Sequence, residues 1–253
     1  METLLARFAP ETSVPELAAL MAAAIMAGLV RGFSGFGTAM VYMPVAGQVL
    51  PPVWAVTTMV VMDAIGPLPN VPRALRDGKP RDVARIALGM LVMTPVGLYA
   101  LRTMPPEAFR YTVSVVTLGL LVLLVGGLRY RGALTPRLLY VTGGVGGLFG
   151  GATGLAGPPV IMLYMASLEI TKVIRANLLL VLVCADAIVL GLLALTGELR
   201  SSAIALGLAV MGPYLLANIA GAAMFNPDRA VLYRRVAYVI IAASALSGLP
   251  LWD

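Results

Sequence analysis

The sequence contains no histidine and only one cysteine, Cys184. The first absence excludes imidazole ligands for zinc and imidazole general bases, and it removes the side chain that most often titrates near neutral pH. The second excludes a disulfide framework and a thiolate metal centre, since either needs several cysteines. We therefore expect a protein without a metal ion or a cofactor.

Charged residues are also scarce, at 12% of the chain against about 25% in a typical soluble domain. Hydrophobic residues make up 60%. One crossing of a bilayer needs about 20 apolar residues, so the composition predicts an all-α, polytopic integral membrane bundle. The N-terminal stretch lacks the basic start and apolar core of a signal peptide. The apolar runs lie at approximately 14–30, 38–50, 53–70, 83–101, 109–128, 138–149, 155–168, 173–196, 203–225 and 230–250.

The net charge of +6 comes from basic residues in short loops between these runs. This placement is how topology is encoded in membrane proteins, so we predict that the partner is lipid and not nucleic acid. The basic segments 71–85, 129–137, 169–175 and 226–235 are assigned to the cytoplasm. Both termini are then predicted on the opposite, periplasmic side.

The two halves of the chain resemble each other at an offset of about 119 residues. The matches follow the same order over the full length, so we infer a first repeat at 1–128, a basic linker at 129–137 and a second repeat at 138–253. Each repeat has an odd number of crossings, which inverts the second repeat relative to the first. The paired residues include Gly28 with Gly147, Gly32 with Gly151, Gly35 with Gly154, Asp63 with Asp186 and Pro95 with Pro213.

The second run of each half, 38–50 or 155–168, is short. Such a run reaches about 20 Å as a helix, less than the ~30 Å hydrocarbon core. We predict tilted fragments, re-entrant pieces or halves of broken helices, and whether either run crosses the bilayer stays open. Inverted repeats with interrupted helices are typical of secondary transporters, whose site lies near the midplane between the repeats.

Two glycine-rich stretches, RGFSGFGT from Arg31 and GGATGLAGPP from Gly150, each end one run and begin the next. Each would direct the N-terminus of a helix toward the site, and such ends suit a small anion. The guanidinium of Arg31 would bind the oxygens of that anion. Two other interpretations of Arg31 stay open: a basic residue at the cytoplasmic end of its helix, or the partner of a buried aspartate. The candidate substrate-binding residues are Arg31, Gly32, Ser34, Gly35, Gly37, Thr38, Gly151, Thr153, Gly154, Gly157, Pro158 and Asn177.

Asp63 and Asp186 each lie deep inside an apolar run. An intramembrane carboxylate costs ~2.5–3.5 kcal/mol on insertion scales, and it therefore indicates a functional role. We predict that at least one of the two couples transport to protons. The alternative is a neutral carboxyl group bonded to backbone that a nearby helix break has freed. Asn177 likewise fits a contact with substrate or a hydrogen bond between helices.

The same residues resemble a known family. AGLVRGFSGFGTAMVYMPV, from Ala27, resembles the opening motif of the TauE/SafE family of membrane transporters, in the branch that reads VRGF-x-GFG, and GGLFGGATGLAGPPVIMLY, from Gly146, resembles its second motif. The resemblance implies a bacterial inner-membrane carrier of small sulfur-containing or organic anions, such as sulfite, sulfoacetate or thiosulfate. It leaves the direction open, and Thr38 departs from the family, in which glycine is common there. The motif residues by position are Arg31, Gly32, Ser34, Gly35, Gly37, Gly150, Gly151, Thr153, Gly154, Gly157, Pro158 and Pro159.

The leading hypothesis is therefore alternating-access transport of a small anion, with proton coupling and without enzymatic activity. An intramembrane enzyme that uses Asp63 and Asp186 as an aspartyl pair is one alternative. An anion channel of the same topology is the other. A homodimer is our working hypothesis for the oligomeric state.

Overall fold

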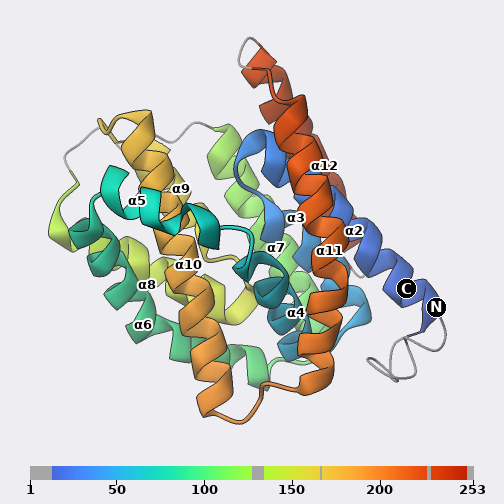
Figure 1. The fold of residues 1–253 in the computed structure, drawn as a ribbon. Helices are drawn as coiled ribbons and strands as arrows, with labels where there is room; N and C mark the ends of the chain where they lie inside the picture. The colour runs from blue at the N-terminus through green and yellow to red at the C-terminus, as the bar shows by residue number, and fades with distance from the viewer. Residues whose placement is uncertain (1–12, 127–133, 166, 227–228, 250–253) are drawn as a thin grey trace. The chain divides into compact units, whose positions relative to one another are not determined.

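All regular structure in the described part of the chain is helical (Figure 1). The computed structural model describes residues 13–126, 134–165, 167–226 and 229–249, and these ranges contain no β-strand. The all-α prediction is confirmed. The elements are α2 Val14–Ser34, α3 Thr38–Val49, α4 Pro52–Ala64, the 3-10 helix η1 Leu68–Asn70, α5 Val71–Asp77, α6 Pro80–Thr103, α7 Pro106–Val125, α8 Pro136–Thr153, α9 Gly157–Met165, α10 Thr171–Leu195, α11 Ser201–Met224 and α12 Ala230–Ser247.

Five of these helices, α2, α6, α7, α10 and α11, are long and apolar enough to cross a bilayer. The chain is thus a multi-pass membrane protein, as its composition predicted. Residues 1–12 and 250–253, and residues 129–133 of the predicted linker, lie outside the described ranges. The predicted sides of the two termini therefore stay predictions.

The two short apolar runs form short helices. α3 has 12 residues and α9 has 9, so they are about 18 Å and 14 Å long at 1.5 Å per residue. Each is well short of the ~30 Å core. In contrast, α2 has 21 residues, so the first glycine-rich stretch follows a helix of full span length.

Local chemistry explains where α2 begins and ends. Ser13 and Glu16 form a capping box, in which the Glu16 carboxylate accepts a hydrogen bond from Ser13 N at 2.7 Å. Gly35 ends the helix with φ at 81°, a left-handed conformation that favours glycine, and its N–H donates to Arg31 O at 2.8 Å. These two signals fix the length of the helix that carries Arg31.

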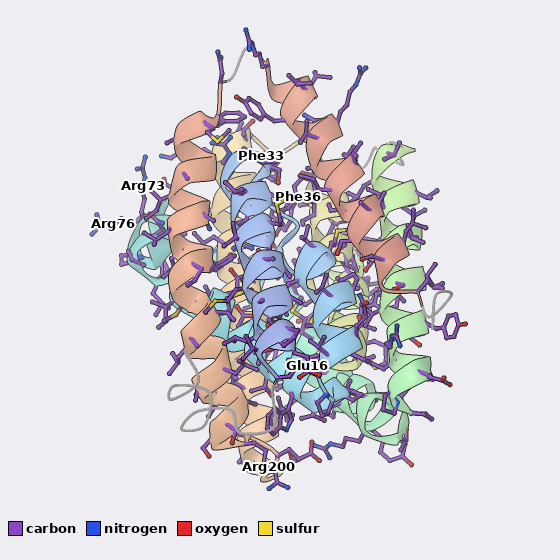
Figure 2. All side chains as sticks on the ribbon, turned by 90° about the vertical axis from the view of Figure 1, so that its right-hand side faces the viewer. Glu16, Phe33, Phe36, Arg73, Arg76 and Arg200 are labelled. Atoms are coloured by element: carbon purple, nitrogen blue, oxygen red, sulfur yellow. The ribbon has the colours of Figure 1, made fainter. Side chains whose placement is uncertain are left out.

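The segment between α4 and α6 differs from the prediction. The apolar run 53–70 divides, because α4 ends at Ala64 and a 3-10 turn follows at Leu68–Asn70, where two prolines interrupt regular backbone hydrogen bonding. The predicted basic loop 71–85 contains a short helix, α5. Arg73 and Arg76 project outward from α5 (Figure 2), as basic side chains near a membrane surface do.

The chain forms two compact units that do not follow the two sequence halves. Unit 1 contains residues 1–63, 104–121 and 197–253, and unit 2 contains residues 64–103 and 122–196. Each unit therefore takes helices from both predicted repeats. In unit 1, α2 packs most extensively on α11, and in unit 2, α8 packs most extensively on α6.

These two helix pairs make the same backbone contact through matched glycines. A Cβ atom on Gly32 of α2 would lie 2.6 Å from Ala222 N, and one on Gly151 of α8 would lie 2.8 Å from Leu98 N. Both distances are too short for any side chain, so the backbones touch directly. The remaining contacts correspond atom by atom: Asn218 O and Gly221 C face Gly32, whereas Thr94 O and Gly97 C face Gly151.

The duplicated contact revises the sequence alignment of the two long helices. It matches Gly97 of α6 with Gly221 of α11, which is not the register that pairs Pro95 with Pro213. The difference arises because the sequence alignment followed the proline, whereas packing is decided by the glycine at the close approach. The same contacts match Met90 in unit 2 with Tyr214 in unit 1, since their carbonyl oxygens face Gly147 and Gly28 respectively.

Candidate functional site

The break between α2 and α3 lies in unit 1. Gly35 and Gly37 both have positive φ, at 81° and 101°, and this turns the chain sharply between the two helices. The Ser34 hydroxyl lies 2.6 Å from Val30 O and 2.8 Å from Phe36 O, so it satisfies backbone groups of the turn. Ser34 therefore supports the shape of the break in this structure.

Four side chains from four helices form a closed hydrogen-bonded ring next to this break. Arg31 Nη1 of α2 lies 3.2 Å from Asp63 Oδ2 of α4 and donates to Thr38 Oγ1 of α3 at 3.4 Å. The Tyr214 hydroxyl of α11 donates to Asp63 Oδ1 and lies 3.1 Å from Thr38 Oγ1. We call Arg31, Thr38, Asp63 and Tyr214 the Arg31 network.

The Arg31 network is largely shielded. The side chain of Arg31 is 15% exposed and that of Asp63 is 8% exposed, while Thr38 and Tyr214 are buried. A buried ion pair contributes little net stability, because desolvation offsets the attraction between its charges. The structure thus places Arg31 beside a buried aspartate, which is one of the three interpretations that the sequence left open, and leaves part of the Arg31 side chain accessible.

The N-terminus of α3 adds hydrogen-bond donors to the same place. Gly37 is the N-cap of this helix, and no side chain caps it. The first N–H groups of a helix have no partner within the helix, and they carry the positive end of its dipole. Thr38, the first residue of α3, joins this helix end to Arg31.

The second break, in unit 2, repeats the left-handed helix end of the first, but not its second left-handed glycine or the side chains of the network. Gly154 ends α8 with φ at 76°, and α9 begins at Gly157 followed by Pro158. The buried Thr153 hydroxyl donates to Phe149 O at 2.8 Å. By repeat position, Gly150 and Gly157 stand where unit 1 has Arg31 and Thr38, and Met90 stands where it has Tyr214.

Asp186, the counterpart of Asp63, lies on α10 of unit 2 and is half-buried. The structure places the other predicted proton carrier, Asp63, in contact with Arg31. The coupling role of either residue stays a prediction.

Asn177 is fully buried, and both ends of its amide bond to protein. Its Oδ1 accepts from Lys79 N at 2.7 Å, and its Nδ2 donates to the Tyr164 hydroxyl at 3.0 Å. Nearby, the Lys79 ammonium lies 2.5 Å from a carboxylate oxygen of Glu169. Asn177 therefore links α10 to α9 and to the turn before α6, which matches its interpretation as a hydrogen bond between helices.

Sequence reasoning missed Tyr214. The residue follows Pro213 in an apolar run, about one helical turn before Asn218, and no charged residue lies near it in that run. The available signal was chemical: a tyrosine in an apolar run needs a partner for its hydroxyl. Asp63 and Thr38 are those partners, yet they are far from Tyr214 in the sequence.

Comparisons with known proteins agree with these motifs. The model of the family described as sulfite exporter TauE/SafE matches residues 20–248, a range that includes both glycine-rich stretches and the whole Arg31 network. The chain is 30% identical over 229 residues to a probable sulfite/organosulfonate exporter TauE of Cupriavidus necator, which covers 86% of this chain and 88% of the relative. No solved structure matches the chain.

Proposed function

Since the chain belongs to the sulfite exporter TauE/SafE family and is a membrane anion transporter, we propose that it carries a small sulfur-containing or organic anion by alternating access. The proposed substrates are sulfite, a sulfonate such as sulfoacetate, or thiosulfate. The name of the Cupriavidus necator relative, which refers to sulfite and organosulfonates, supports this class.

The Arg31 network carries the proposal. A guanidinium presents its N–H donors in a fork that fits oxyanions, and it stays charged at any depth. Arg31 is partly accessible, and it lies beside the uncapped start of α3 and the Thr38 hydroxyl. A tetrahedral oxyanion could thus be bound by a charge, a hydroxyl and backbone N–H groups together.

Unit 2 supports a functional role over a purely structural one. Its α8 also ends at a left-handed glycine, Gly154, although glycine stands at the positions of Arg31 and Thr38. This helix end therefore does not require these side chains. Burial of a charged residue is costly, and Arg31 is not needed to form the helix end. We therefore expect Arg31 to bind the solute.

The predicted topology accompanies this function. We propose that the protein lies in a bacterial inner membrane with its N-terminus in the periplasm and that it forms a homodimer. Within unit 1 the contacts of Gly28 and Gly32 advance together along α11, so α2 and α11 run parallel. Their starts lie at one end, as Glu16 and Arg200 show in Figure 2, which supports a common side for the N-terminus and the segment before α11.

The test uses the purified full chain. We expect thermal unfolding to shift in the presence of sulfite, sulfoacetate or thiosulfate, and we expect Arg31→Ala to lose this shift because the oxyanion loses its charged partner. Arg73→Ala is the control, because Arg73 is 83% exposed and pairs along its own helix with Asp77. An Arg31→Ala protein that folds and retains the shift would contradict the proposal.

Flux measurements then separate a carrier from a channel. In liposomes that contain the protein, we expect the rate of anion uptake to saturate with anion concentration. An alternating-access carrier must complete one conformational cycle for each anion that it transports, and this cycle limits the rate. Uptake that rises linearly with concentration would favour the channel.

A further inference from the structure

We propose that the beginning of α12 binds the headgroup of an anionic phospholipid through Arg234 and Arg235. The site lies within unit 1, and the inference depends neither on Arg31 nor on the transported anion. It also gives a role to the two phenylalanines of the RGFSGFGT stretch, which the candidate anion site does not use.

The first observation is that Arg234 and Arg235 have no carboxylate partner. Both residues are exposed, and in the described ranges no carboxylate lies within ion-pair distance of either. In unit 2, by contrast, Asp77, Asp82 and Glu169 each pair with at least one basic side chain of their own unit. The positive charge at the beginning of α12 is therefore available to an external anion.

The second observation is that exposed apolar side chains flank this charge. Leu232 is 54% exposed and Val239 is 68% exposed. Residues three or four apart lie on the same face of a helix, so both lie beside Arg235. A phospholipid fits this combination, because its phosphate can bind guanidinium groups while its acyl chains cover the apolar face. A soluble anion would leave that face uncovered.

The third observation is that aromatic contacts hold the beginning of α12 against the first glycine-rich stretch. Tyr233 packs on Phe33 of α2 and on Phe225, which follows α11, with ring centroids 5.5 Å and 5.7 Å apart. Tyr238 packs on Phe36 of the same stretch, with centroids 6.3 Å apart. The two tyrosines flank the arginines in the sequence, so these contacts fix the part of α12 that carries the charge.

These aromatic residues mark one end of unit 1. Figure 2 shows Phe33 and Phe36 at the end opposite Glu16 and Arg200. Tyrosine is enriched where a membrane meets water, with its ring at the level of the headgroups. Tyr233 and its neighbouring arginines are therefore expected at the depth of the lipid phosphates.

The experiment compares two lipids on the purified full chain in detergent micelles. Phosphatidylglycerol is anionic and phosphatidylcholine has no net charge, while both can carry the same acyl chains. We expect phosphatidylglycerol to raise the unfolding temperature more than phosphatidylcholine at the same mole fraction, because a ligand that binds the folded state stabilises it. Each arginine near an anionic surface contributes roughly fivefold to affinity. The double variant Arg234→Gln, Arg235→Gln should therefore bind about 25-fold more weakly and lose the difference between the two lipids.

A second double variant, Arg73→Gln with Arg76→Gln, is the matched control. It removes the same charge from α5 in unit 2, where both side chains also project outward (Figure 2) and Asp77 already offsets part of the charge. We expect this variant to keep the full difference between the lipids. An equal loss in both double variants would show that only overall charge matters, and would overturn the site.

Hydrogen exchange locates the bound lipid. We expect phosphatidylglycerol to slow exchange in the segment 229–240, and we expect glycerol 3-phosphate, which has no acyl chains, to have no effect. Equal protection by glycerol 3-phosphate would assign the surface to a soluble phosphate and overturn the lipid. Protection in phosphatidylcholine alone, with a dimer by mass, would show that a second copy covers this face and would overturn it as well.

The wild type decides the question if the α12 variant does not fold. Exposed charges are screened at high salt, since the Debye length is about 3 Å at 1 M. We therefore expect the difference between the two lipids to disappear at about 1 M salt. A difference that persists there would contradict binding through exposed arginines.

Discussion

The replacement of Gly32 by alanine tests the link between helix packing and the Arg31 network. A Cβ atom at this position would lie 2.6 Å from Ala222 N and 2.9 Å from Gly221 C. Ordinary contacts begin near 3.4 Å, so α2 and α11 would have to separate by roughly 1 Å. Since α11 also carries Tyr214, this movement would lengthen hydrogen bonds of the network that are already 3.1 Å or longer, including the one to Thr38.

The expected magnitude follows from overpacking, which typically costs about 1–3 kcal/mol. We expect Gly32→Ala to lower the unfolding temperature of the purified protein and to weaken anion binding, because both depend on the same helix spacing. Gly119→Ala is the control: Gly119 lies in the interior of α7, nothing lies within 4 Å of its would-be Cβ, and alanine there should stabilise the helix by up to ~1 kcal/mol.

The reasoning would be refuted if the two variants unfolded at the same temperature. It would be refuted in part if Gly32→Ala were destabilised and yet bound the anion as tightly as the wild type. In that case helix contact would determine stability without positioning Tyr214, and the network would tolerate a shift of its fourth member.

Two further predictions concern unit 2. We expect Asn177→Leu to lower stability by about 2–5 kcal/mol in thermal or denaturant unfolding, because it leaves the buried Tyr164 hydroxyl and the part-buried Lys79 N–H without a hydrogen bond; a change below ~1 kcal/mol would contradict this role. The hydrogen bond from Lys172 lowers the pKa of Asp77. This contact therefore stabilises the fold fully at pH values above the ordinary pKa of an aspartate, and the stabilisation is lost as the pH falls through the lowered pKa. Lys172→Met should therefore destabilise the protein at neutral pH and have little effect in acid, and equal destabilisation at both would disprove the assignment.

Much of the fold could be predicted from the order of residues along the chain. Apolar runs long enough to span a bilayer became α2, α6, α7, α10 and α11, because lipid requires every backbone group of a crossing segment to bond within its own helix. The short runs 38–50 and 155–168 became the short helices α3 and α9. The predicted run 53–70 extends several residues beyond the end of α4 at Ala64, because prolines after Asp63 interrupt the helix.

The site could be predicted only in part. Arg31 and Asp63 were recognisable one at a time, because charge inside an apolar run is expensive. Their contact with each other was one of three open interpretations, and Tyr214 was not considered. A tyrosine is compatible with many surroundings, so its role depends on which helix lies next to it, and this cannot be read from the residues around it.

The sequence by itself determined that this chain is helical, crosses a membrane and repeats a glycine-rich break, because length, apolarity and glycine act within one segment. Only the tertiary structure decided that α2 packs on α11 and α8 on α6, and that one break carries an ion pair while its counterpart carries glycine. Helix partners are chosen by the fit of whole surfaces, here by glycines that let two backbones touch. That choice brings Tyr214 to Asp63 and turns two separate charges into one network.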